Sequence, residues 1–227
     1  MNQPQQEKLE DAHKFQFWKT QMELNGMKMN GVQERFVRRR GNGEVLFALL
    51  EVDADTPEGD KIPPVLFLKG HAASVLVCLI DEATGEKFVV LVRQRRISDG
   101  SQTYEHPAGM VDASDAADEV AAREVGEEIG LPILAEELTK LNPRLWYPST
   151  GTSDEAMHYF FVEKTMPRDD IMAFHHKNMG NQSEYERIIT VVTTLPEAHK
   201  LINNINGLLI HFLYLQHVGD YETMKRL

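Results

Sequence analysis

Three glutamates near the middle of the chain have a spacing that suits metal chemistry. Glu124, Glu127 and Glu128 are three and four residues apart, so a helix would place them on one face. Like charges at this spacing repel one another and destabilise the helix that carries them. Carboxylate oxygens are also the ligands that Mg²⁺ and Mn²⁺ prefer. The cluster therefore predicts a divalent-cation site, and a solvated acidic helix face is the ordinary alternative.

The residues around these glutamates resemble the Nudix box, which consists of a leading glycine, a loop, and a helix ending in Arg-Glu-apolar-x-Glu-Glu-x-Gly-apolar. Gly109 stands at the leading glycine, and residues 123–131 read REVGEEIGL. The pattern departs at one position, because Asp115 stands where the family has a glutamate. Gly126 inside the predicted helix costs roughly 1 kcal/mol relative to alanine. We expect close packing against Gly126 to explain that cost.

The resemblance implies a role for each residue of the box. Metal ligands would come from one backbone carbonyl and three side chains, namely Ala108, Glu124, Glu127 and Glu128. Glu127 and Glu128 would also take part in catalysis. The remaining box residues would be structural, with the arginine pairing to a neighbouring glutamate; they are Gly109, Asp115, Arg123 and Gly130.

Residues before and after the box resemble the substrate-binding parts of Nudix hydrolases that act on nucleotide sugars. Residues 105–109 read EHPAG, like the Glu-x-Pro-Ala-Gly motif of that group, and we interpret His106 as a surface or loop histidine rather than a base. The arginine-rich run 93–96 could clamp a diphosphate through its guanidinium groups. A Tyr-Pro-Ser segment at 147–149 resembles the loop that follows the box in ADP-ribose and ADP-sugar hydrolases. The predicted substrate-binding residues are Arg93, Arg96, Glu105 and Ser149.

A water nucleophile also needs a general base within hydrogen-bond reach. In the ADP-ribose pyrophosphatase group, the base is a glutamate on a loop before a late strand. Residues 178–186 form the corresponding loop, and Glu184 best matches the family spacing. Glu186 is the alternative base, and an ordinary solvated loop acid is the alternative role for both.

The elements that must position these residues follow from hydrophobic patterns and turn signals. Gly41-Asn42-Gly43 predicts a hairpin between two strands near the N-terminus. A leading helix, a central acidic helix and two C-terminal helices accompany several short strands. Strands are expected at residues 32–40, 44–52, 65–68, 74–80, 88–95, 157–163 and 187–194, and helices at 5–24, 115–129, 196–203 and 208–218. Residues 134–141 fit either state.

Composition narrows the class of protein. The net charge of −11 argues against a general nucleic-acid binder, which is normally basic. Cys78 is the one cysteine, so no intrachain disulfide can form, and it lies in an apolar run that predicts a buried, inert thiol. No apolar run reaches the length of a membrane span, and no signal peptide is evident. We expect an intracellular, cytoplasmic protein, and an organelle is left open.

Taken together, the patterns predict an α+β protein, which the resemblance makes a Nudix α/β/α sandwich with a mixed β-sheet. A small N-terminal helix and antiparallel β subdomain would span residues 1–64, and the Nudix domain would span residues 65–227. The resemblance implies Mg²⁺- or Mn²⁺-dependent hydrolysis of ADP-ribose or an ADP-sugar such as ADP-glucose to AMP and a sugar phosphate. It also implies a homodimer, with no nucleic-acid or membrane partner. The alternatives are a UDP-glucose pyrophosphatase and a non-catalytic Nudix-like nucleotide-binding module, though the intact box acids favour activity.

Overall fold

The computed structural model describes residues 6–111, 116–180 and 187–227. The chain divides into two compact units. The N-terminal unit comprises described residues 6–71, 110–111 and 147–157, and the C-terminal unit comprises the described residues between and after these segments. No helix of the described residues is long and apolar enough to cross a membrane. The division expected at residue 64 remains a prediction.

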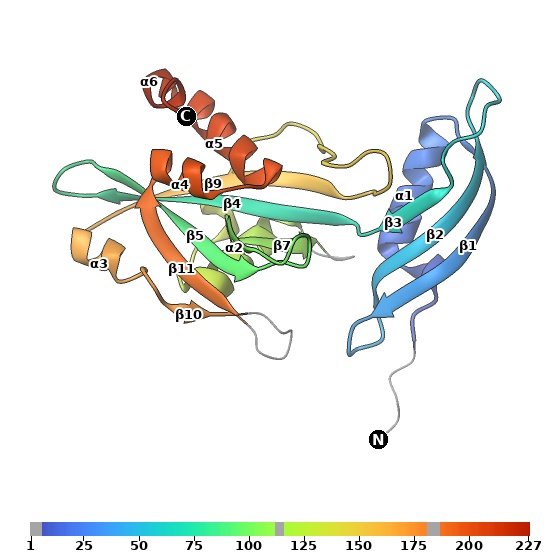
Figure 1. The fold of residues 1–227 in the computed structure, drawn as a ribbon, viewed down its shortest axis with the longest axis horizontal. Coiled ribbons are helices and arrows are strands. Elements are labelled where there is room, and N and C mark those ends of the chain that lie inside the picture. The colour runs from blue at the N-terminus through green and yellow to red at the C-terminus, as the bar shows by residue number, and fades with distance from the viewer. Residues whose placement is uncertain (1–5, 112–115, 181–186) are drawn as a thin grey trace. The chain divides into compact units, whose positions relative to one another are not determined.

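The N-terminal unit is a three-stranded antiparallel sheet covered by one helix (Figure 1). Its strands run in the order β1 (Lys28–Arg39), β2 (Val45–Asp55) and β3 (Val65–Leu68), and its helix is α1 (His13–Leu24), preceded by a 3₁₀ turn at Leu9–Asp11. The helix begins later than the predicted residue 5. The predicted hairpin is present, with Gly43 at a positive φ of 95° in the turn between β1 and β2.

Alternation along β2 decides which face of this sheet is buried. Ala48, Leu50 and Val52 are buried and pack with Phe15 and Trp18 of α1 in one apolar core. The intervening side chains, including Leu49, lie on the opposite face. The sheet therefore has one covered face and one face that the helix does not cover.

The C-terminal unit contains an eight-stranded sheet with the order β10-β11-β5-β4-β9-β8, in which β6 pairs with β5 and β7 pairs with β4. The strands are β4 (His71–Asp81), β5 (Lys87–Arg95), β6 (Gln102–Glu105), β7 (Ala108–Val111), β8 (Thr139–Lys140), β9 (Ala156–Met166), β10 (Asn178–Met179) and β11 (Ile188–Thr194). The helices are α2 (Ala117–Ile129), α3 (Arg168–Met172), α4 (Leu195–Leu201), α5 (Ile205–Val218) and α6 (Tyr221–Met224), with a 3₁₀ turn at Ala135–Glu137.

Helices cover both faces of this sheet, which gives the predicted α/β/α sandwich. α2 packs on one face, and α4 and α5 lie on the other (Figure 1). The central strands β4 and β5 are buried on both faces, which explains why their apolar residues form continuous runs. Cys78 of β4 is buried as expected, and burial raises the pKa of its thiol to about 11.

The irregular region between the box and β9 contains a 3₁₀ turn followed by the two-residue strand β8, so residues 134–141 are neither one helix nor one long strand. The short elements β6, β7 and α3 were not predicted. Each has only four or five residues, too few to show a hydrophobic period, and none is a continuous run of large apolar side chains like the predicted β3.

Candidate active site

Helix α2 presents the box carboxylates. Asp118 and Glu119 occupy its first turn, where negative charge is favourable near the helix N-terminus. The helix ends at Gly130, which adopts the left-handed conformation with a φ of 74° and donates its N–H to the carbonyl of Gly126. Gly130 therefore ends the helix, and its role in the box stays a prediction.

Glu128 lies at the inner side of this helix and reaches the segment that begins strand β7. Its side chain is only 6% exposed, and its Oε2 accepts a hydrogen bond of 3.0 Å from the N–H of Ala108. A carboxylate this deeply buried needs polar or cationic partners. The helix therefore holds one acidic side chain directly against the backbone at residue 108.

Glu124 reaches the neighbouring residue of the same segment. A Cβ atom added to Gly109 would lie 2.0 Å from the Oε1 of Glu124, far inside van der Waals contact. Only glycine allows the carboxylate to approach the backbone this closely. The leading glycine of the box is explained by this contact, which the sequence pattern did not reveal.

Two of the three clustered carboxylates therefore converge on one backbone segment. Glu124 and Glu128 are four residues apart and both meet residues 108–109, whereas Glu127 is exposed on α2. Within the described parts of the chain, no group of three His, Cys, Asp or Glu side chains is arranged to hold a metal ion. Two carboxylates of the described residues thus meet this segment, and the carbonyl of Ala108 remains a predicted ligand.

Two further box residues, Arg123 and Gly126, both have surroundings that are open. The guanidinium of Arg123 is exposed, and its Nη2 lies 4.0 Å from the Oε1 of Glu124. The expectation of close packing at Gly126 was wrong, because no described heavy atom outside the adjoining backbone of the helix lies within 4 Å of a Cβ built there. The helix was expected to need space at this position, but the side that Gly126 presents is open among the described residues.

Arg96 and Glu105 form a bidentate ion pair. The Nε and Nη2 atoms of Arg96 donate to the two carboxylate oxygens of Glu105 at 2.9 and 2.7 Å. Thr103 adds a third hydrogen bond, from its Oγ1 to Glu105 at 2.6 Å. Thr103 carries no motif, so nothing in the sequence distinguished it from any other strand threonine. The predicted phosphate ligand Arg96 is therefore already held in position by the predicted substrate residue Glu105.

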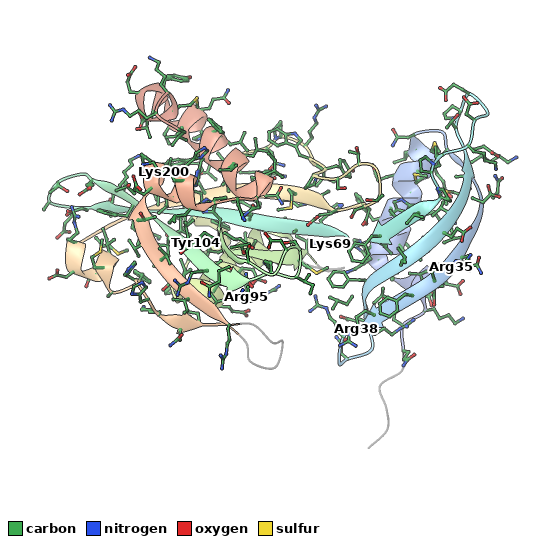
Figure 2. The ribbon with its side chains drawn as sticks, in the orientation of Figure 1. Arg35, Arg38, Lys69, Arg95, Tyr104 and Lys200 are labelled. Atoms are coloured by element: carbon green, nitrogen blue, oxygen red, sulfur yellow. The ribbon has the colours of Figure 1, made fainter. Side chains whose placement is uncertain are left out.

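The other arginines of the run differ in their surroundings. Strand β5, which carries Arg93 and Arg95, pairs with β6, so that Arg93 stands opposite Tyr104 and Arg95 stands opposite Gln102. Figure 2 labels Arg95 and Tyr104 on these two strands. Arg95 donates a hydrogen bond to the carbonyl of Gly100. The Nε of Arg93 is buried and has no hydrogen-bond partner among the described residues, the condition of a donor that a ligand could satisfy.

The remaining predicted site residues either belong to the N-terminal unit or lie outside the residues that the structure describes. Ser149 is exposed and belongs to the N-terminal unit, in the segment that is attached to β3 by the hydrogen bond from Phe67 to Thr152. Asp115, Glu184 and Glu186 lie outside the described residues.

His106 was expected to be a surface or loop histidine. It does lie in the turn between β6 and β7, but it is not at the surface. Its side chain is only 2% exposed, and its Nε2 lies 2.9 Å from the Nε2 of His211 on α5. A histidine that follows Glu105 in a loop gives no sign in the sequence that a helix 105 residues later covers it.

The family model for the NUDIX domain matches residues 70–180. This chain contains a Nudix domain. The match includes the two carboxylates of α2 and the residue 108–109 segment that they contact, so the described site lies within the Nudix domain.

Two curated relatives of this Nudix protein differ in how much of their length they share with it. "Nudix hydrolase 14, chloroplastic" from Arabidopsis thaliana is 36% identical over 143 residues, which cover 59% of this chain and 45% of the plant protein. "ADP-ribose pyrophosphatase" from Bacillus subtilis (strain 168) is 26% identical over 178 residues, which cover 78% of this chain and 86% of the bacterial protein. The Nudix chain thus matches less than half of the plant relative.

A solved structure described as "Crystal structure of ADP compounds hydrolase" has the same fold. Its TM-score against this Nudix chain is 0.58 at 19% sequence identity, and the match covers 85% of this chain and 96% of that one. The predicted α+β sandwich is confirmed by this likeness and by the element order.

Proposed function

We propose that this Nudix chain hydrolyses the diphosphate bond of ADP-ribose or an ADP-sugar such as ADP-glucose, giving AMP and a sugar phosphate. The observation that carries the proposal is the convergence of Glu124 and Glu128 on Ala108 and Gly109. The substrate class is supported by the bacterial relative named as an ADP-ribose pyrophosphatase and by the structural neighbour described as an ADP compounds hydrolase.

Mg²⁺ or Mn²⁺ is the proposed cofactor, and the donor set fits it. Carboxylate and carbonyl oxygens are the donors that these cations prefer. Glu124, Glu128 and the Ala108 carbonyl would hold the ion, and the exposed Glu127 would reach a second ion or a water molecule. When bound, the cation would neutralise charge on the diphosphate and acidify a water. The close contact at Gly109 keeps the carboxylate of Glu124 facing the backbone of this segment.

Arginines before the box would orient the diphosphate. Arg93 supports this role because its buried Nε has no partner among the described residues. Arg96 would contact a phosphate oxygen only while its pairing with Glu105 keeps the guanidinium plane in place. Ser149 is proposed to meet the sugar or phosphate through its hydroxyl.

A loop glutamate would act as the general base. Glu184 is proposed to accept a proton from the attacking water as the new P–O bond forms, and Glu186 is the alternative. Since both lie outside the described residues, family spacing alone supports this assignment.

The deciding experiment is a panel of ADP-ribose, ADP-glucose and UDP-glucose with Mg²⁺, with released AMP or UMP as the readout. Faster release of AMP supports the proposal, and preferred release of UMP would identify the UDP-glucose pyrophosphatase. Binding of these compounds without hydrolysis in either Mg²⁺ or Mn²⁺ would identify a non-catalytic binding module. The Glu128→Gln variant serves as the control for contaminating hydrolases.

We also propose that the protein is a homodimer that binds a small nucleotide sugar and neither nucleic acid nor membrane. An apolar sheet face in the N-terminal unit supports the dimer, because it exposes the side chains of Phe36, Leu49, Val65 and Phe67. A cytoplasmic location remains a prediction.

A further inference from the structure

Three histidines form a row inside the C-terminal unit. The Nε2 of His106 lies 2.9 Å from the Nε2 of His211, and the Nδ1 of His211 lies 3.1 Å from the Nδ1 of His199. His106 and His211 are buried, at 2% and 0% exposure. His106 comes from the turn between β6 and β7, His211 from α5, and His199 from α4. The row thus links α4 and α5 to the turn just before Ala108.

Burial keeps these rings neutral at neutral pH. It lowers the pKa of His106 well below the usual range and that of His211 to about 3, and it also lowers the pKa of His199. A neutral imidazole has one N–H, so His211 donates from one nitrogen and accepts at the other. One of the facing nitrogens, Nε2 of His106 or Nδ1 of His199, must therefore carry a proton, and the other must accept one.

One end of the row decides the direction of these hydrogen bonds. The Nδ1 of His106 is buried and has no hydrogen-bond partner among the described residues. A buried N–H without a partner is rarer and costlier than a buried acceptor without one. The favoured arrangement therefore places the proton of His106 on Nε2, where it donates to His211, and His211 then donates from Nδ1 to His199.

The turn between β6 and β7 is also held by other elements. The amide of Asn204, which caps α5, donates to the carbonyl of Tyr104 at 3.3 Å. The N–H of Val75 on β4 donates to the carbonyl of Pro107 at 2.9 Å. Glu128 of α2 accepts from Ala108. Residues 104–108 are thus held by a helix on each face of the sheet and by the central strand.

We propose that His211 is a positioning residue for the metal site, acting through His106 to fix the backbone that carries Glu105 and the carbonyl of Ala108. Apolar packing at this point would fill the same space without a preferred direction. A hydrogen bond between two buried rings instead sets both the distance and the orientation of the turn. Partners of this kind, one step removed from the ligands, tune metal affinity in other proteins. The inference rests on the metal site named in the proposed function.

Metal affinity tests the proposal independently of turnover. Full-length protein would be titrated with Mn²⁺, and free Mn²⁺ followed by electron paramagnetic resonance. His211→Leu should weaken Mn²⁺ binding about 10-fold, as loss of such a partner does elsewhere. His211→Gln should restore most of the affinity, because its carboxamide can reach the position of Nε2. His217→Leu makes the same change at an exposed position of the same helix and should bind Mn²⁺ normally.

A double variant covers the case in which His211→Leu does not fold. His106→Leu/His211→Leu removes both rings, so neither is left buried without the other, and the fold should be retained. The hydrogen bond that orients the turn is lost in this variant. It should show the same weakening of about 10-fold. Wild-type Mn²⁺ affinity in a folded His211→Leu or double variant, or equal weakening in His217→Leu, would overturn the proposal.

The two proposals fail in different ways. If the wild-type protein binds Mn²⁺ but hydrolyses no nucleotide sugar, the proposed function is wrong, and the affinities of the variants still decide the role of His211. If the wild-type protein binds no Mn²⁺ even at millimolar concentration, the metal site and the positioning role are both rejected.

Discussion

Glu128 is buried and accepts a hydrogen bond from the backbone of Ala108. A substitution can remove its negative charge and keep this hydrogen bond. Glu128→Gln keeps an oxygen that can accept from the N–H of Ala108, and the fold should survive. Loss of the charge should reduce Mg²⁺-dependent turnover by at least about 100-fold, since removing even a partner of a metal ligand costs about 10–100-fold. Steady-state rates at several Mg²⁺ concentrations and a thermal melt measure both effects.

The control for this substitution is Glu119→Gln, an exposed acid in the first turn of the same helix. It should retain wild-type turnover. Near-normal turnover in a folded Glu128→Gln protein would reject Glu128 as a metal ligand.

Gly109 offers a second test, because its backbone touches the carboxylate of Glu124. In Gly109→Ala the new methyl group would occupy the position of the Glu124 carboxylate, which must rotate away. Since the end of a glutamate side chain is flexible, we expect little loss of stability but a rise of about 10-fold in the Mg²⁺ concentration for half-maximal activity. The measurement is a Mg²⁺ titration of activity.

Gly126→Ala is the matched comparison on α2. No described atom opposes the added methyl group, and alanine is the better helix former, so stability should rise by up to about 1 kcal/mol with an unchanged Mg²⁺ requirement. An unchanged Mg²⁺ requirement in Gly109→Ala would show that the position of Glu124 does not matter for metal binding.

The assignment of the base is tested by comparing two glutamates of one loop. Glu184→Gln should lower kcat by about 100-fold or more and change KM little, because general-base catalysis contributes about 10²- to 10⁴-fold. Glu186→Gln is the parallel variant, and initial rates across a range of ADP-ribose concentrations separate kcat from KM. If Glu186→Gln shows the larger loss, the base is Glu186.

At the scale of elements, Asp81 joins the end of β4 to helix α3. Its carboxylate accepts hydrogen bonds from the hydroxyl of Thr84, the N–H of Ala83 and the Nε of Arg168, at 2.8, 3.0 and 2.8 Å. These bonds, the Thr84 hydroxyl foremost, lower the pKa of Asp81. A lowered pKa means that the ionised carboxylate stabilises the fold above its usual pKa, and that this stability is lost as pH falls through the lowered value.

The Asp81→Asn variant should therefore be less stable than wild type at pH 7. The difference should shrink below about pH 4, where Asp81 of the unfolded wild-type chain takes up a proton while Asp81 of the folded protein is still ionised. Urea unfolding at pH 7 and at about pH 3 measures the two differences. Glu82→Gln, an exposed neighbour, should show no such pH-dependent difference. An equal loss at both pH values would mean that Asp81 acts through its shape and not its charge.

At the scale of the whole molecule, the apolar face of the N-terminal sheet predicts self-association. Phe36 pairs with Leu49, which pairs with Phe67, so these side chains are cross-strand neighbours and form one patch. Phe36 is 59% exposed. Light scattering at micromolar concentration should give twice the chain mass of 25.9 kDa.

Phe36→Ser/Phe67→Ser should shift the protein toward the monomer, whereas Leu134→Ser, at an exposed leucine of the other unit, should leave the dimer intact. A monomeric mass for the wild-type protein would refute the homodimer. A dimer that survives the double substitution would move the interface to another surface.

The sequence by itself determined most of the elements and the box. The helix of the box, the N-terminal hairpin and the central strands follow from patterns within about 20 residues, which local backbone preferences and periodic burial control. The fold class and the acidic cluster were therefore predictable. Glu124 and Glu128 could be placed on one helix face because their spacing alone decides it.

Only the tertiary structure decided what those residues contact. It placed Glu124 and Glu128 against residues 108–109 and left Glu127 exposed, and it paired Arg96 with Glu105. It also buried His106 against His211, which is 105 residues away. Such contacts depend on how separate elements pack across a sheet, and no pattern within a single element records the side chain that will face it from another.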